Sequence, residues 1–391
     1  MTIIFFDDQS SETLLPLTYT RPVADLRIGI MKISEKWLFH YKTEGFHQTR
    51  PYLQNKFPLK ASDNQLFING SVCPNEALLD AINSLKEGET LISDETCIAV
   101  KTGEVSFDPA DLTNFKSINF DGNFIKVTYP EDLFKYNPDA IRADFDVLTK
   151  GRTSNKLSST NTVIGDDIFV EYGVEAECST FNTKNGPIYL GKNSQVWEGT
   201  NIRGALALCA DSQIKMGAKI YGATTIGPNS RVGGEINNAV IWGNSSKGHE
   251  GYLGNAVLGE WCNIGADSNN SNLKNNYAEV KLWDYTQQRF RKTGLQFCGL
   301  IMADHAKCGI NTMFNTGTVV GVGANVFGPG FPRNYVADFA WGGAQGFEVY
   351  SLNKMFETAT KVFERRGKMF DETERNILTN IFNNTQEYRR F

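Results

Sequence analysis

The chain has 391 residues, a formal net charge of −5 at pH 7 and 41% hydrophobic residues. This length exceeds what one ordinary core holds, so two or three domains are expected. The negative balance predicts no broad attraction to nucleic acid or to an anionic membrane. No apolar run is long enough to predict a membrane span, and the N-terminus lacks the basic flank of a signal peptide. The seven cysteines contain no CxxC pair, so we expect reduced thiols in a cytoplasmic protein.

Residues 1–155 have the pattern of a mixed α/β domain. Short apolar runs predict strands at residues 3–6, 66–68 and 90–92, and helical spacing of apolar residues predicts a helix around residues 76–85. Residues 15–22 read Leu-Pro-Leu-Thr-Tyr-Thr-Arg-Pro. This segment is similar to the signature of sugar-1-phosphate nucleotidyltransferases, so the resemblance implies that fold for the first domain.

The resemblance also implies a phosphate site, from which three features are missing. The family's glycine-rich loop corresponds to residues 7–12, which contain no glycine and three carboxylates that would repel a triphosphate. The family's lysine after the Arg-Pro pair is Val23 here. The strand ending in Asn69 and Gly70 resembles the family's Asn-Gly-Asp element, with Ser71 at the position of the metal-binding aspartate. The metal ligands, and therefore any Mg²⁺ site, are not identified by the sequence.

Three cations remain as candidates for binding a nucleotide phosphate, together with the Asn-Gly pair described above. They are Arg21, Arg27 and Lys36. The alternative is that these side chains form structural or surface ion pairs, and the sequence does not decide between the two.

The second zone, residues 156–331, is dominated by an aliphatic residue at every sixth position. An α-helix has a period of 3.6 and a strand a period of 2, so neither explains this repeat. A short internal period is typical of a solenoid, whose units bury their apolar faces against their neighbours. Residues 269–294 interrupt the register, and we expect them to project as a loop. The repeated positions are Leu190, Val196, Ile202, Leu208, Ile214, Ile220, Ile226 and Val232, then Met302, Cys308, Phe314, Val320 and Val326.

This pattern resembles the hexapeptide repeat of the left-handed parallel β-helix, in which three hexads make one triangular coil. The resemblance implies an acyltransferase, because many proteins with this fold are acyltransferases. We expect Phe331-Pro332 to close the repeat. Residues 332–391 then predict a helical tail, with one helix after Ser351 and a second after Asp371, covering the last coil.

Of the four histidines, His249 is the main catalytic candidate. It lies in a run, residues 245–254, that contains Lys247 and ends in Tyr252-Leu-Gly, and Asn263 opens an Asn-Ile-Gly-Ala sequence downstream. This run resembles the acetyltransferase half of the bifunctional bacterial enzymes that acetylate glucosamine 1-phosphate and then uridylylate it. A histidine suits the reaction, because it can accept the proton of an attacking amine near neutral pH.

The resemblance implies a role for each matching residue. His249 falls on the catalytic base, Tyr252 on a sugar-phosphate contact, and Asn263 on an active-site asparagine, while Lys247 joins them as a candidate substrate contact. Asn272 falls on the asparagine of the family's Asn-Tyr pair, whose tyrosine is replaced by Leu273. The lysine that the family carries upstream is Asn237 here. The alternative for His249 is a polar residue on an exposed corner.

The remaining histidines have weaker claims. His305 follows Asp304 at a polar corner, and we keep it as a candidate helper because such β-helices commonly form homotrimers with sites between subunits. His40 and His47 lie among aromatic residues and are expected to be structural.

Three functions stay open at this point. The first is a cytoplasmic enzyme of amino-sugar nucleotide synthesis that serves the cell envelope. It would use acetyl-CoA to acetylate a hexosamine 1-phosphate. It would possess a second activity, the Mg²⁺-dependent transfer of a nucleotide from UTP or another nucleoside triphosphate to the sugar 1-phosphate. The second is a nucleotidyltransferase whose β-helix only regulates or oligomerises. The third is a trimeric protein that binds sugar phosphates without turnover.

Overall fold

The computed structural model describes residues 2–60, 62 and 65–391. They form two compact units, Met1–Leu26 with Met31–Tyr129, and Arg27–Ile30 with Pro130–Phe391. The second unit therefore takes in a short segment of the N-terminal region and begins well before residue 156. No helix among the described residues has the length and apolar character needed to cross a membrane.

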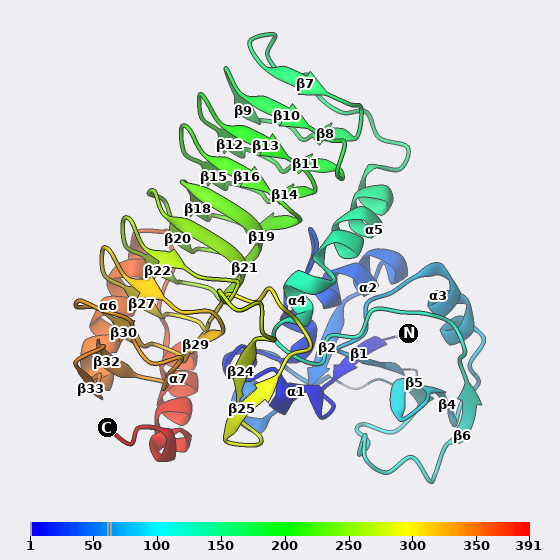
Figure 1. Cartoon of the computed structure of the whole chain (residues 1–391). Helices are drawn as coiled ribbons and strands as arrows, with labels where there is room; N and C mark the ends of the chain where they lie inside the picture. The colour runs from blue at the N-terminus through cyan, green and yellow to red at the C-terminus, as the bar shows by residue number, and fades with distance from the viewer. Residues whose placement is uncertain (1, 61, 63–64) are drawn as a thin grey trace. The chain divides into compact units, whose positions relative to one another are not determined.

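The first unit is an α/β domain built on one six-stranded sheet of order β2-β1-β3-β5-β4-β6 (Figure 1). Strand β1 is parallel to β2 and β3, whereas β5 is antiparallel to both β3 and β4. The predicted strands and the predicted helix are all present. The elements are β1 (Thr2–Phe6), α1 (Ser10–Thr13), η1 (Val23–Asp25), α2 (Ile33–Tyr41), β2 (Gly45–Gln48), η2 (Pro51–Leu53), β3 (Gln65–Asn69), α3 (Glu76–Asn83), β4 (Glu89–Ser93), β5 (Thr96–Thr102) and β6 (Lys116–Asn119).

The second unit contains the parallel β-helix that the hexads predict, with strands stacked coil upon coil as in Figure 1. Two helices precede it, α4 (Asp132–Lys135) and α5 (Asn137–Thr149). The strands on two sides of the coils are β7 (Thr162–Ile164), β8 (Ile168–Val170), β10 (Thr180–Asn182), β11 (Ile188–Leu190), β13 (Asn201–Arg203), β14 (Leu206–Leu208), β16 (Lys219–Tyr221), β17 (Thr224–Ile226), β19 (Glu235–Ile241), β21 (Tyr252–Leu258), β26 (Leu300–Met302), β29 (Thr318–Val320) and β31 (Tyr335–Val336). Those on the third side are β9 (Glu175–Ala176), β12 (Gln195–Val196), β15 (Gln213–Ile214), β18 (Arg231–Val232), β20 (Ser246–Lys247), β22 (Asn263–Ile264), β27 (Lys307–Cys308), β30 (Asn325–Val326), β32 (Ala340–Gly343) and β33 (Gly346–Val349).

The hexad residues fill the inside of the coils, as predicted. Val196 pairs with Ile214, and Ile214 pairs with Val232, so three hexads complete one turn. Each of the predicted inward residues is buried in one continuous core. The small residues between them, such as Ser194 and Thr200, are fully buried at the corners.

The coils continue beyond Phe331-Pro332, which corrects the expected end of the repeat. Strand β31 pairs in parallel with β29, and β32 pairs in parallel with β30. The interruption contains β23 (Asn269–Asn270), which joins β28 (Met313–Phe314), and an antiparallel hairpin of β24 (Lys281–Asp284) and β25 (Arg289–Lys292).

The C-terminal tail forms the two predicted helices, α6 (Leu352–Glu364) and α7 (Glu372–Asn384), followed by η3 (Gln386–Tyr388). The carboxylate of Asp371 accepts a 3.0 Å hydrogen bond from the Glu374 N–H, so this aspartate is the N-cap that the sequence predicts. Phe363 of α6 stacks on Trp261, with ring centroids 3.8 Å apart. The helix is therefore packed against the coil that carries Trp261.

Candidate functional site

The first unit has a cavity of about 510 Å³ where the loop after β1 meets the neighbouring strands. Its lining is acidic, and among the described residues that line it Lys126 is the one cation. The Lys126 Nζ lies 3.0 Å from the Asp8 carboxylate. The lining residues are Asp7, Asp8, Gln9, Ser11, Glu12, Glu95, Thr96, Cys97, Asp108, Pro109, Ala110 and Lys126.

The pKa values of the two aspartates after β1 shift in opposite directions because their surroundings differ. Burial raises the pKa of Asp7 to about 6, although hydrogen bonds from Thr49 and the Val23 N–H oppose the shift. Burial also acts to raise the pKa of Asp8, but Lys126 and the amide of Asn69 outweigh it, so that pKa is lowered. Asp8 is therefore the more acidic of these two carboxyl groups.

The Asn-Gly pair at the end of β3 lies beside this acidic loop. Asn69 is opposite Phe6 in the parallel pairing of β1 with β3, and its Nδ2 donates to Asp8 over 2.9 Å. A Cβ on Gly70 would lie 2.9 Å from the Ala24 backbone nitrogen, so the close approach of two segments requires glycine here. The structure thus places Asn69 next to the cavity and gives Gly70 a packing role.

The three candidate phosphate cations are buried. Arg21 is 4% exposed and its Nη1 lies 3.4 Å from Asp25, and Lys36 is also 4% exposed. Neither is among the residues that line the acidic cavity. Arg27 belongs to the second unit, where its Nη1 donates to the Ile30 carbonyl. Arg21 and Lys36 thus lie in the first unit and Arg27 in the second, and none of the three lines the acidic cavity.

The second unit carries the candidate acetyl-transfer site at one corner of the β-helix. His249 lies in the turn between β20 and β21 and is exposed. Tyr252 opens β21, and its hydroxyl accepts hydrogen bonds from the Nδ2 atoms of Asn272 at 2.9 Å and Asn237 at 3.4 Å. Asn272 also donates to the Asn255 side chain over 2.7 Å. The corner thus presents the imidazole of His249 and the phenol of Tyr252, whose hydroxyl accepts hydrogen bonds from two asparagine side chains.

Asn263 and His305 lie elsewhere on the coils. Asn263 is exposed on β22, where it pairs with Ser246 of the preceding coil and with Lys307 of the next. His305 is 4% exposed, with its ring centroid 6.3 Å from Trp261 and 6.0 Å from Phe363. Its ring is therefore covered by aromatic side chains, one of them from α6.

Lys247 points into the β-helix instead of toward solvent. It pairs with the inward-facing Val232, is 1% exposed, and its Nζ donates to the carbonyls of Gly233 at 3.0 Å and His249 at 2.6 Å. Burial lowers the pKa of Lys247 from 10.5 to about 8, although Glu250 and Asp267 oppose the shift. The ammonium group thereby links the backbone at Gly233 to the backbone at His249.

This shift predicts an unusual pH dependence of stability. Between pH 8 and 10.5 the unfolded chain holds a proton on Lys247 that the folded chain has lost, so the free energy of unfolding should rise with pH through that window. Relative to a Lys247→Met variant, the parent should gain up to about 3 kcal/mol. Urea unfolding of both proteins across this range measures the difference. Parallel pH curves for the two proteins would contradict the assignment.

Sequence reasoning missed several residues that shape these sites. Asn255 has a positive φ of 46°, a conformation that asparagine adopts more readily than most residues. Its residue type is therefore the one local feature of the sequence that is consistent with a turn at this position. Arg50 donates to the carbonyls of Thr18 and Ser11, both at 2.7 Å, and so shapes the loop that lacks glycine. Nothing in the sequence around Arg50 marks this role.

Comparison with known proteins finds a family match in the N-terminal part of the chain. Residues 3–153 match the family model described as sugar nucleotidyl transferase. The bifunctional protein GlmU of Trichormus variabilis is 31% identical over 139 residues, which are 32% of this chain and 30% of that protein. GlmU of Methanocaldococcus jannaschii is 31% identical over 100 residues, 25% of this chain and 24% of that protein.

A solved structure also overlaps this chain. The Francisella novicida UDP-N-acetylglucosamine acyltransferase shares 15% identity over 56% of this chain and 74% of its own, at a TM-score of 0.26. That score is too low to support any conclusion. The alignments with the GlmU proteins cover about 30% or less of those proteins' lengths. Residues 3–153 thus match the model of the sugar nucleotidyl transferase family, and about a third of the chain or less is similar to part of the bifunctional GlmU proteins.

Proposed function

We propose that the β-helix unit transfers an acetyl group from acetyl-CoA to the amino group of a hexosamine 1-phosphate, with His249 as the general base. The observation that carries the proposal is the corner geometry. The exposed His249 lies three residues before Tyr252, whose hydroxyl accepts a 2.9 Å hydrogen bond from the Asn272 Nδ2. The resemblance of this run to the acetyltransferase half of the bifunctional family supports the same assignment.

In the proposed reaction the sugar's neutral amine attacks the thioester carbonyl. The C–N bond forms while the imidazole of His249 accepts the amine proton, and backbone N–H groups at the corner stabilise the charge on the oxygen. The C–S bond then breaks, and the proton passes to the departing thiolate. One thiol is released for each acetyl group transferred.

The other residues of the corner have supporting roles in this proposal. Tyr252 and Asn272 bind hydroxyl or phosphate oxygens of the sugar phosphate, and Asn263 extends this polar surface on the neighbouring side of the coil. Lys247 acts as a positioning residue, because its ammonium holds the His249 carbonyl at 2.6 Å. His305 is assigned no contact with substrate, because its ring is covered by Trp261 and Phe363.

The test is thiol release from acetyl-CoA by the purified full-length protein with glucosamine 1-phosphate as acceptor. Galactosamine 1-phosphate and glucosamine 6-phosphate serve as control acceptors. Release that requires the 1-phosphate sugar supports the proposal. Release that is independent of any sugar, or absent with every acceptor, contradicts it.

We propose as a second activity that the first unit transfers a nucleotide from UTP or another nucleoside triphosphate to a sugar 1-phosphate. The family match of residues 3–153 supports this. Among the described residues, no group of three or more His, Cys, Asp or Glu side chains is arranged to hold a metal ion. We therefore expect Mg²⁺ to enter with the triphosphate, whose charge it would offset next to Asp8 and the other carboxylates. Lys126 would contact a phosphate oxygen from within the cavity.

This assignment predicts that Lys126→Gln lowers pyrophosphate release at least about tenfold, because Lys126 is the one cation among the described residues that line the cavity. Release should also stop when Mg²⁺ is chelated. The matched control is Lys116→Gln in the same unit, whose side chain is 73% exposed and pairs with Glu89. Equal losses in the two variants, or release that persists in excess chelator, would refute the site.

We further propose that the protein is a cytoplasmic homotrimer. The support is the β-helix itself, since proteins of this fold commonly associate in threes, and a sequence whose seven cysteines contain no CxxC pair. Sedimentation equilibrium of the full chain measures the assembly state, and a monomer at micromolar concentration would contradict the trimer.

A further inference from the structure

A second cavity in the β-helix unit, of about 600 Å³, combines cations with aromatic rings. It lies between the β24–β25 hairpin and the last coils, and none of its lining residues is one that the family resemblance assigns. Its volume is in the range of small-molecule sites. The lining residues are Lys274, Lys281, Trp283, Phe290, Thr316, Arg333, Asn334 and Tyr335.

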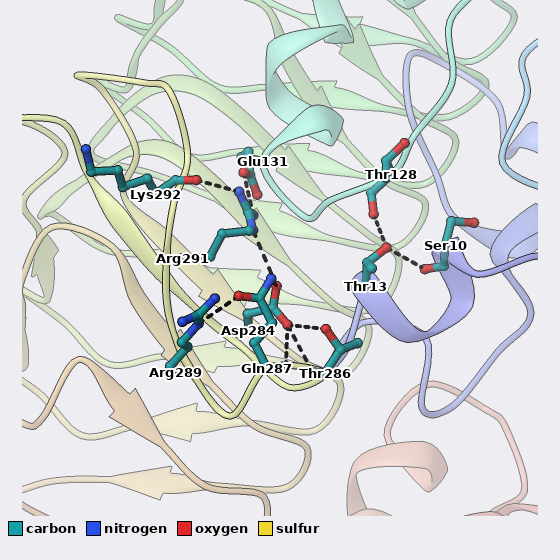
Figure 2. Close-up of polar contacts among 10 residues, drawn as sticks. All are labelled: Ser10, Thr13, Thr128, Glu131, Asp284, Thr286, Gln287, Arg289, Arg291 and Lys292. Carbon is teal, nitrogen blue, oxygen red and sulfur yellow. Dashed lines mark hydrogen bonds and ion pairs between the residues drawn. The ribbon is translucent and has the colours of Figure 1, made fainter. Parts of the chain in front are cut away.

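The hairpin divides its side chains between two faces. Leu282 and Asp284 point to the buried face, together with Arg291, which lies opposite Leu282. Figure 2 shows the Arg291 guanidinium held by Glu131 and Asp284, with N–O distances of 2.6 Å and 3.5 Å. These contacts fix the hairpin to its own unit, so its opposite face is presented in one orientation.

That opposite face carries the side chains that line the cavity. Lys281 and Trp283 alternate with the buried residues, and Phe290 lies directly across from Trp283. Trp283 stacks on Tyr335, with ring centroids 4.3 Å apart and planes at 14°. Phe290 meets Trp283 edge to face and is 41% exposed. The cavity therefore has a preformed aromatic wall with an accessible ring.

This face of the hairpin is positively charged, and no acidic side chain among the lining residues neutralises it. No carboxylate is among the lining residues, and neither Lys281 nor Arg333 has an acidic partner in the part of the chain that the structure describes. Lys281 also lies directly opposite Lys292, a like-charge pair that destabilises a hairpin unless an anion is bound nearby. Lys292 is partly offset by Glu279 at 3.6 Å. Such a concentration of cations is unexpected in a chain with a net charge of −5.

We infer that this cavity binds a nucleoside phosphate. The base would stack on the aromatic wall at Phe290 and Trp283, and the phosphates would pair with Lys281 and Arg333. The net negative charge of the chain and the cavity volume of about 600 Å³ favour a mononucleotide over a nucleic acid. This inference does not depend on His249 or on acetyl transfer, because it concerns binding alone.

The test is isothermal titration of the full chain with UDP, ADP, adenosine 3′,5′-bisphosphate and inorganic pyrophosphate. A Lys281→Gln/Arg333→Gln variant should bind the preferred nucleotide at least about tenfold more weakly, and Phe290→Ala about 5- to 100-fold more weakly. All three side chains are exposed, so folding should be retained, which thermal unfolding verifies. Arg289→Gln is the matched control, since Arg289 is on the same hairpin and does not line the cavity.

The probes also separate the two sources of such a ligand. Preference for adenosine 3′,5′-bisphosphate assigns the cavity to the nucleotide end of coenzyme A, and preference for UDP assigns it to a nucleotide sugar. Equal binding of pyrophosphate and nucleotides would overturn the inference, because the aromatic wall would then contribute nothing. Nucleotide binding that is unchanged in the double variant, or a short oligonucleotide that binds more tightly than every mononucleotide, would overturn it as well.

Discussion

His249→Ala should lower the rate of acetyl transfer by about 10²- to 10⁴-fold, the usual contribution of a general base. The imidazole is exposed at a corner of the β-helix and its backbone carbonyl keeps the hydrogen bond from Lys247. The substitution therefore removes the base without removing a packing contact, and the unfolding temperature should stay within about 2 °C of the parent. Initial rates of thiol release at saturating sugar phosphate measure the effect.

The pattern of loss distinguishes a base from a binding residue. Removal of a base should reduce kcat and leave KM for the sugar nearly unchanged, whereas Tyr252→Phe should mainly raise that KM. His40→Ala, at an exposed histidine of the first unit, is the matched control and should keep full activity. An unaltered rate in His249→Ala would remove this residue from the mechanism.

Leu208→Ala should destabilise the β-helix by about 2–5 kcal/mol, because the deleted methyl groups leave a cavity that the coils cannot close. Leu208 is 0% exposed and pairs with Leu190 of the preceding coil and Ile226 of the following one. A stacked solenoid depends on contacts between adjacent coils, so a defect in one coil weakens both of its neighbours.

Denaturant unfolding monitored by circular dichroism measures this loss. Ile310→Ala is the matched control, since Ile310 is 71% exposed and its truncation should change the free energy of unfolding by less than about 0.5 kcal/mol. Equal effects of the two substitutions would show that the hexad residue is not part of a tightly packed core.

The β-helix was predictable because its inward positions follow a strict period. From Leu190 to Val232 each hexad position is a buried core residue. Beyond Val232 the coils change length, since β19 and β21 each run for seven residues and the period of six is lost. The inward position on β20 then falls on Lys247, which residue preference alone would place at the surface.

The candidate sites were only partly predictable, because their key contacts join residues far apart in sequence. Tyr252 and Asn272 are separated by 20 residues and meet through the return of the chain around one coil. Arg27 is one of the cations that the sequence offers for a phosphate, yet its guanidinium donates a hydrogen bond to the Ile30 carbonyl. Periodicity reports which face of an element is buried, but not which side chains from different coils or loops converge.

The most direct measurement of the central claim follows the acetyl group itself. The full-length protein is incubated with isotopically labelled acetyl-CoA and glucosamine 1-phosphate, and the products are separated and identified by mass spectrometry. We predict that the label appears as an amide on the amino sugar, in step with thiol release. Label that remains on the coenzyme, or that appears only as free acetate, would contradict acetyl transfer by this protein.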